Sequence, residues 1–253
     1  IGVSAGARGG AAVPAAAPPR APADTPITST AELVRRMHDR YAGKWYRTLS
    51  FTQNNTLYRS GGGEDRSQWL EYMAVPGRLR IEYMPRESKS GVLFENDRVH
   101  AFNAGKLLQT QRRVHPLLLM SADVYAIPAD TTVRRLDSLG VDTGKFRVDT
   151  LDGRRVYVVG AAAGDSTAPQ VWVDADRLLT RRLIEQQSLG ARTVVTDARF
   201  NGYADFEGVP VATEMLFLRD GRPVFKEEYT DVKVNVPLSD ELFDPGKWSD
   251  AKP

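Results

Sequence analysis

Residues 78–83 read Arg-Leu-Arg-Ile-Glu-Tyr, an alternation of charged and large apolar side chains. Successive side chains of a β-strand point to opposite faces, so this period of two predicts a strand with one apolar and one polar face. On the C-terminal side, Asn96-Asp97 separates two short strands at residues 91–95 and 98–103. On the N-terminal side, residues 45–57 alternate in the same way. The first half of the chain is therefore predicted to be a β-meander.

The second half of the chain repeats this organisation. Asp152-Gly153 and Asp220-Gly221 are strong hairpin turns between strand-forming runs. The predicted strands span residues 145–151, 155–159, 171–173, 178–187, 193–200, 209–218 and 224–234. Short loops imply antiparallel neighbours. We therefore predict a mainly β (α+β) fold whose large antiparallel sheet is strongly curved or partly closed.

Two helical elements accompany the predicted sheet. Ser29 and Glu32 form a capping box, and apolar residues at helical spacing follow it up to Tyr41. Gly43 is suited to end this helix in a left-handed conformation. The second element is an insertion over residues 114–140, in which an apolar turn is followed by a short helix.

The first 26 residues are almost wholly Ala, Pro and Gly, which is typical of a disordered tail. The chain does not begin with Met, and this opening resembles the surroundings of a signal-cleavage site. We expect export through a signal peptide, with a truncated cytosolic linker as the alternative. Residues 27–253 are expected to form a single domain, because no second composition break follows.

Composition excludes several classes of protein. Lys and Arg total 34 and Asp and Glu total 32, so the net charge of +2 gives little reason to expect a nucleic-acid partner. The chain has no apolar run long enough for a membrane-spanning helix. It also has no cysteine, which excludes disulfides, thiol catalysis and thiolate metal sites.

Catalytic motifs were searched for without success. Residues 2–6 match the G-x-S-x-G pattern but have no strand before them and no helix after them. Residues 140–145 fall one position short of a phosphate-binding loop. The histidines, His38, His100 and His115, lack metal-ligand spacing and are expected to be surface or capped polar residues. We predict no enzyme activity, no metal and no cofactor, although carboxylates that meet only in space stay possible.

The apolar face of the predicted sheet needs a cover. Its residues are Leu49, Phe51, Leu79, Ile81, Tyr83, Val171, Val173, Met215 and Phe217. The available cover is the first helix and the insertion, which contributes Leu118 and Met120. Two interpretations stay open on these residues alone. A complete cover makes an ordinary closed core, whereas an incomplete or mobile one makes an apolar cleft that accepts acyl chains.

Several stretches, taken in order, resemble the LolA/LolB-like outer-membrane lipoprotein-sorting proteins. The resemblance covers residues 28–245, and the stretches that carry it are residues 51–53, 76–83, 92–103, 171–179, 208–210, 234–238 and 242–245. It implies an unclosed antiparallel β-barrel with a helical lid over an apolar cavity for lipid acyl chains in the periplasm. It makes the eleven apolar residues named above, Leu118 and Met120 included, the expected lipid-binding residues.

The resemblance also implies a function. We expect a soluble, monomeric periplasmic carrier of lipid acyl chains or acylated lipoproteins, bound for the outer membrane and handed to an inner- or outer-membrane protein. The alternative is a periplasmic sensor that binds a protein partner with the same half-barrel. In LolA an arginine inside the barrel contacts the lid. Arg80 is on the matching strand, but the alternation places it opposite Leu79 and Ile81. Without a cysteine, a lipid-anchored LolB-type receptor is not expected.

Overall fold

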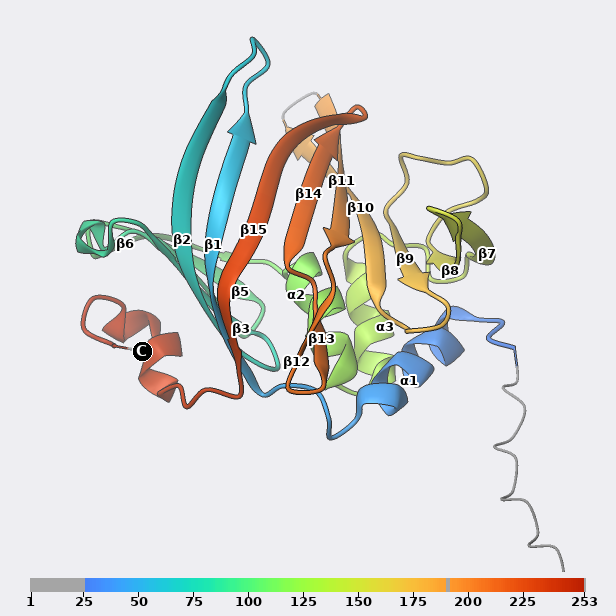
Figure 1. Cartoon of the computed structure of the whole chain (residues 1–253), viewed down its shortest axis with the longest axis horizontal. Coiled ribbons are helices and arrows are strands. Elements are labelled where there is room, and N and C mark those ends of the chain that lie inside the picture. The colour runs from blue at the N-terminus through green and yellow to red at the C-terminus, as the bar shows by residue number, and fades with distance from the viewer. Residues whose placement is uncertain (1–25, 190–191, 253) are drawn as a thin grey trace, which may run out of the picture.

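The computed structural model describes residues 26–189 and 192–252, so nearly all of the predicted tail lies outside the described residues. Thirteen strands form one sheet (Figure 1), in which all paired neighbours are antiparallel. They are β1 (Thr48–Tyr58), β2 (Glu64–Ala74), β3 (Arg78–Tyr83), β4 (Gly91–Glu95), β5 (Arg98–Asn103), β6 (Lys106–Arg112), β7 (Phe146–Leu151), β8 (Arg154–Val159), β9 (Gln170–Asp174), β10 (Thr180–Leu189), β11 (Arg192–Asn201), β14 (Glu214–Arg219) and β15 (Arg222–Val234). A small separate hairpin contains β12 (Ala204–Phe206) and β13 (Val209–Val211).

The sheet is open and strongly curved. Its strand order is β6-β5-β4-β3-β2-β1-β15-β14-β11-β10-β9-β8-β7, so β6 and β7 are unpaired edges. The pairing of β1 with β15 joins the N-terminal meander to the second half of the chain. In Figure 1 these two strands stand at the centre of the sheet, with β6 and β7 at its opposite ends. The predicted fold class, an unclosed antiparallel half-barrel with helices, is confirmed.

The predicted hairpin turns are present and have the expected backbone. Asn96 and Asp97 have φ angles of 49° and 56°, and Asp152 and Gly153 have 50° and 74°. Two successive left-handed residues are what a two-residue turn needs in order to match the right-handed twist of its strands. These turns place each strand beside the next one in the sequence.

Three details of the predicted strands are wrong or incomplete. Residues 209–218 do not form one strand. The extended segment is interrupted between β13 and β14, where the Thr213 hydroxyl donates to the Gly202 carbonyl at 2.6 Å. Strand β6 was not predicted, and all seven of its side chains are exposed, so it has no burial alternation to detect. Strand β2 was marked by little more than Trp69, and β12 is only three residues long.

Helix α1 (Thr30–Tyr41) begins where the capping box predicts. The Ser29 hydroxyl accepts a hydrogen bond from the Glu32 amide at 3.2 Å. The Glu32 carboxylate reaches back to the Thr28 amide at 3.3 Å, one residue further than the motif requires. The apolar stripe of this helix, Leu33, Val34 and Met37, is buried against α3 and the neighbouring 3₁₀ turn.

The predicted insertion is a helical lid, defined here as residues 116–138. It contains α2 (Pro116–Ser121), a 3₁₀ turn (Asp123–Tyr125) and α3 (Ala129–Ser138). Its apolar residues share one hydrophobic core with the inward-facing side chains of the sheet. In Figure 1, α2 and α3 lie behind the strands on one side of the sheet, and α1 runs along its lower edge.

The opposite, convex side of the sheet is covered by the C-terminal segment. Residues 239–252 contain two 3₁₀ turns, Asp240–Phe243 and Pro245–Lys247. They form a second, smaller core by packing on the convex face of β2, β4 and β5, and its buried members are Ala74, Leu93, Phe102, Leu242, Phe243 and Trp248. Trp248 stacks on Phe102 with 4.3 Å between ring centroids and 3° between planes. The sheet therefore separates this second core from the main one, and Val156, Val158 and Trp172 on β8 and β9 form a third, smaller cluster.

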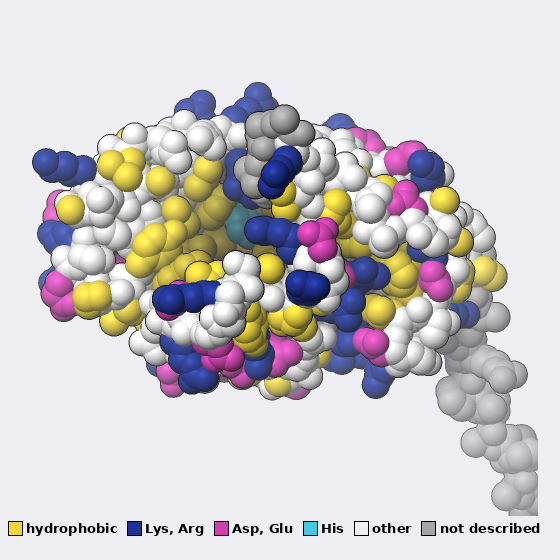
Figure 2. Space-filling model, turned by 90° about the horizontal axis from the view of Figure 1, so that it is seen from above, with side chains coloured by type: hydrophobic (Ala, Val, Ile, Leu, Met, Phe, Trp, Pro, Cys, Tyr) yellow, Lys and Arg dark blue, Asp and Glu magenta, His cyan; other side chains and the backbone are white. Residues whose placement is uncertain are grey.

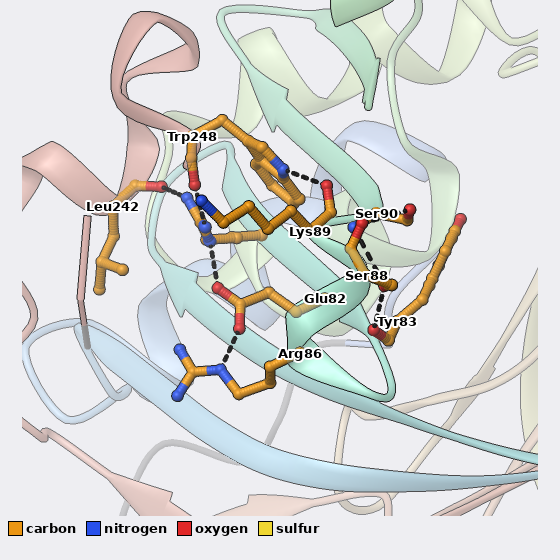
Figure 3. A network of polar contacts seen from close by, with 9 residues as sticks. Glu82, Tyr83, Arg86, Ser88, Lys89, Ser90, Leu242 and Trp248 are labelled. Atoms are coloured by element: carbon orange, nitrogen blue, oxygen red, sulfur yellow. Dashed lines mark hydrogen bonds and ion pairs between the residues drawn. The ribbon is translucent and has the colours of Figure 1, made fainter. Parts of the chain in front are cut away.

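Arg80 is the polar centre of this second core (Figure 3). Its Nε donates to Glu82 at 2.7 Å, and its two Nη atoms donate to the carbonyl oxygens of Leu242 at 3.1 Å and Trp248 at 2.7 Å. The guanidinium also lies 4.0 Å from the centroid of the Trp248 ring. Arg86 donates to the other oxygen of Glu82 at 2.8 Å. On the charged face of residues 78–83, Arg80 and Glu82 are thus a buried ion pair, whereas Arg78 is partly exposed, and the polar partners of Arg80 lie outside the lid.

Candidate ligand-binding cavity

A cavity of about 150 Å³ lies between the concave face of the sheet and the first helix of the lid. Seen from above, this side of the molecule is hollowed, and hydrophobic side chains line much of the hollow (Figure 2). The walls come from β1, β2, β3, β11, β14 and β15, and α2 covers one side. The register places the wall residues, because Phe51 pairs with Glu71, which in turn pairs with Ile81 across three adjacent strands.

Six of the eleven predicted lipid-binding residues line this cavity. They are Leu49, Phe51, Leu79, Ile81, Leu118 and Met215. Each is buried, with no more than 7% of its surface exposed. Their inward orientation follows from the period of two in the strands and from the position of Leu118 on α2. The central apolar wall was therefore recognisable from the sequence.

The other five predicted residues lie outside the cavity lining. Tyr83 and Phe217 are only partly buried, and they extend the apolar surface beyond the cavity through Trp69 and Phe225. Trp69 itself lines the cavity, and its ring centroid is 5.0 Å from that of Tyr83. The remaining three, Met120, Val171 and Val173, are at most 1% exposed in the main core.

A closed core fills the part of the concave face beside β9 and β10, because the helices pack closely against it. The Tyr41 hydroxyl donates to the Arg177 carbonyl at 2.8 Å, and the Tyr125 hydroxyl donates to the Leu178 carbonyl at 3.2 Å. The Thr180 hydroxyl donates to the Met120 carbonyl at 2.7 Å. Both interpretations of the apolar face are thus present in one molecule: a solid core beside β9 and β10, and a cavity beside β1 to β3.

The cavity also contains a group of polar residues that the sequence analysis did not select. This polar cluster consists of Gln53, Glu71, Glu227 and Tyr229, all of which line the cavity. The signal was present in the alternation, because Gln53 follows Phe51 on the inward face of β1 and Glu71 lies between Trp69 and Met73 on that of β2. The sequence left open that carboxylates meet in space, but it singled out neither glutamate.

Hydrogen bonds within the polar cluster are incomplete. The Tyr229 hydroxyl donates to Glu227 at 2.6 Å, and the Gln53 amide donates to Asn55 at 2.7 Å. The Asn55 Nδ2 is buried without a partner. Glu71 is 4% exposed, and no described residue forms a hydrogen bond or ion pair with it.

Both carboxyls of the cluster favour the neutral form. Burial raises the pKa of Glu71 well above its ordinary value, and the nearby Glu227 adds to the rise. Burial also raises the pKa of Glu227 to about 7, although hydrogen bonds from Tyr229 and Gln53 oppose the shift. Removal of a carboxylate from water disfavours its charge, and a second carboxylate nearby disfavours it further.

His115 forms the lid side of the cavity entrance. Its Nδ1 accepts a hydrogen bond from the Leu118 amide at 3.1 Å and so caps α2, a role that the sequence did not predict. Its ring meets Phe94 edge-on at 4.5 Å. Burial, with a contribution from the positive charge of Arg113, lowers the pKa of His115 to about 4. The imidazole is therefore neutral near pH 7 and carries its proton on Nε2.

Few polar contacts hold the lid to the meander. The buried Asp123 carboxylate accepts from the Gly77 amide at 2.8 Å, and Arg135 bridges Asp123 at 3.4 Å and Asp97 at 3.2 Å. Burial raises the pKa of Asp123 to about 6, against the effects of Gly77 and Arg135. The arginine that ties the lid to the sheet is thus Arg135, on the lid itself.

The described residues contain no group of three or more His, Asp or Glu side chains arranged to hold a metal ion. No described helix is long and apolar enough to cross a bilayer. The chemistry available in the cavity is therefore that of apolar contact and of the polar cluster.

An open antiparallel sheet, a lid over its concave face and a cavity between them define a half-barrel of the LolA type. No protein-family model matches the sequence, and no curated protein matches it. Solved structures do share the fold.

A LolA superfamily protein from Nitrosomonas europaea is 13% identical, and the match covers 86% of this chain and 98% of that one with a TM-score of 0.54. A DUF1329 family protein from Desulfovibrio piger is 16% identical over 85% and 95% of the two chains, with a TM-score of 0.56. An outer membrane lipoprotein-sorting protein domain from Vibrio parahaemolyticus is 12% identical over 87% and 97%, with a TM-score of 0.57. The resemblance found in the sequence is thus confirmed at the level of the fold.

Proposed function

We propose that the protein is a periplasmic carrier that holds an aliphatic chain of a lipid or lipoprotein between its sheet and its lid and delivers it towards the outer membrane. The observation that carries the proposal is the cavity between α2 and the apolar inner face of β1 to β3. Burial of each methylene contributes about 0.8 kcal/mol, so a chain of ten methylenes contributes about 8 kcal/mol.

The size of the cavity requires the lid to move. A cavity near 150 Å³ accepts a molecule about the size of benzene, whereas ligand sites typically enclose roughly 300–1,000 Å³. Only a few methylenes therefore fit while the lid is closed. On its meander side the lid is tied by few polar contacts, through Asp123 and Arg135, which supports an opening on that side that a bound chain would stabilise.

The test is displacement of an uncharged fluorescent probe by C12 amphiphiles, together with native mass spectrometry of the gently purified protein. Leu117 lines the cavity from the lid and is only partly buried, so Leu117→Gln leaves the core intact. We expect this variant to bind the probe about tenfold more weakly, because a polar amide replaces an apolar contact.

The matched control is Leu108→Gln on the exposed edge strand β6, where the leucine is 66% exposed. Its affinity should equal that of the unmodified protein. Absence of both probe binding and co-purified lipid would refute the carrier. Recovery of a membrane protein without lipid would favour the sensor alternative instead.

A further inference from the structure

The described cavity wall contains acidic groups and no permanent cation. Two carboxyls, Glu71 and Glu227, line it, and none of its described lining residues is a lysine or an arginine. Both lie on the concave face near the central strand β1, Glu71 opposite Phe51 and Glu227 opposite Asn55. Gln53 lies on β1 between Phe51 and Asn55, directly opposite Tyr229 of β15. The carboxyls are thus diagonal neighbours of one residue.

The polar cluster is rich in hydrogen-bond acceptors and poor in free donors. The Tyr229 hydroxyl already donates to Glu227, and the Gln53 amide already donates to Asn55. Glu71 has acceptor oxygens but no donor from any described residue, although it is 96% buried and lines the cavity. The Glu71 oxygens are therefore available to accept hydrogen bonds from a ligand in the cavity.

A ligand that satisfies the site must donate hydrogen bonds and must not be an anion. A fatty-acid carboxylate or a phosphate would place a negative charge beside two carboxyls in a low-dielectric cavity and would oppose the ionisation of both. A protonated primary amine has three donors and a positive charge, and charge-assisted hydrogen bonds to carboxylates are roughly twice as strong as neutral ones. The lid contributes the uncharged Leu117, Leu118 and Ser121 to the lining, and the adjacent His115 is neutral, so neither adds a competing cation.

We infer that the cavity selects amphiphiles with a primary amine, which Glu71 and Glu227 bind while the aliphatic chain lies against Phe51, Ile81 and Leu118. This inference rests on the proposed carrier function and names its ligand class. Binding of the cation would also restore the ionised form of the carboxyls, so affinity should increase from pH 6 to pH 8.

The test compares dodecylamine, dodecanol and dodecanoate as competitors of the uncharged probe. We expect dodecylamine to bind about tenfold more tightly than dodecanol, and dodecanoate to be the weakest, because charge-assisted hydrogen bonds contribute about 1.5–3 kcal/mol. Glu71→Gln and Glu227→Gln should each reduce the ratio of dodecylamine affinity to dodecanol affinity towards one.

The matched control is Glu228→Gln, which removes an exposed carboxylate from the opposite face of the same strand. It should keep the preference for the amine. Equal affinity for the three competitors, a preference for dodecanoate, or a preference that survives both cavity substitutions would overturn the inference while leaving the carrier intact. Failure of all three to displace the probe would instead contradict the carrier function.

A second arm distinguishes the sources of the amine. An amine-headed lipid and a diacylated peptide with a free α-amine are each compared with their N-acetylated forms. Tighter binding of either free amine supports the inference and identifies its source. Equal binding of the free and acetylated forms in both pairs would overturn it.

Discussion

Glu227 is a buried carboxyl whose ionisation opposes folding. Its folded-state pKa of about 7 lies above the ordinary value of 4.5. Between these values the folded protein binds more protons than the unfolded chain, so this residue makes stability fall as the pH rises through that window. Asp123, with a pKa raised to about 6, acts in the same direction, whereas His115, with a pKa lowered to about 4, acts in the opposite one.

Comparison with Glu227→Gln isolates the contribution of this one group. From pH 5 to pH 8 the unmodified protein should lose up to about 3 kcal/mol of unfolding free energy that the variant keeps. Urea unfolding at both pH values measures the difference. Parallel pH profiles for the two proteins would show that Glu227 titrates as it does in the unfolded chain.

Arg80 and Arg78 provide a matched pair on the convex face of β3. Arg80 is 3% exposed and makes three hydrogen bonds, whereas Arg78 forms one ion pair with the exposed Asp240. We expect Arg80→Ala to lower the unfolding free energy by about 3 kcal/mol, because it leaves buried acceptors without donors. Arg78→Ala should cost less than about 1 kcal/mol. Similar losses in both variants, measured by denaturant unfolding, would contradict the buried network.

At the scale of single elements, helix α3 of the lid has one arginine that pairs with residues outside the helix and one that pairs within it. Arg134 and Arg135 are adjacent on α3, but only Arg135 reaches outside the helix, to Asp97 and Asp123. Arg134 pairs with Asp130 within its own helix. This contrast separates the stability of the helix from the attachment of the lid.

Arg135→Ala should therefore make the lid open more often. We expect amide hydrogen exchange over residues 116–138 to quicken about tenfold, because charged hydrogen bonds contribute about 1.5–3 kcal/mol. Arg134→Ala should leave the exchange rate of the same segment nearly unchanged. Equal exchange rates in the two variants would mean that apolar packing, and not Arg135, keeps the lid closed.

At the scale of the whole molecule, the main core and the core under the C-terminal segment lie on opposite faces of one sheet. Trp248 belongs to the convex core and is 3% exposed, whereas Trp69 lines the cavity on the concave side. Because the sheet separates them, stability and ligand binding should respond to different residues.

Trp248→Ala should lower the unfolding free energy by about 3 kcal/mol or more, the usual cost for a buried Trp. It should leave the affinity for the uncharged probe within about twofold, as expected for distant sites. Trp69→Ala, a change at the partly exposed cavity wall, should instead weaken probe binding more than it lowers stability. A loss of probe affinity in Trp248→Ala would show that the two cores are coupled.

The sequence by itself determined the antiparallel fold, its hairpin turns, its first helix and the central apolar wall of the cavity. Those features depend on local rules, since the period of two fixes which side chains share a face, and turn residues such as Asp152-Gly153 fix which strands are neighbours. Tertiary structure alone decided what covers each face. The C-terminal segment buries Arg80, the helices close the core over Val171 and Val173, and a gap at α2 leaves Glu71 facing a cavity. Burial depends on segments far away in the sequence, so the period of two identified the faces but could not identify which were covered.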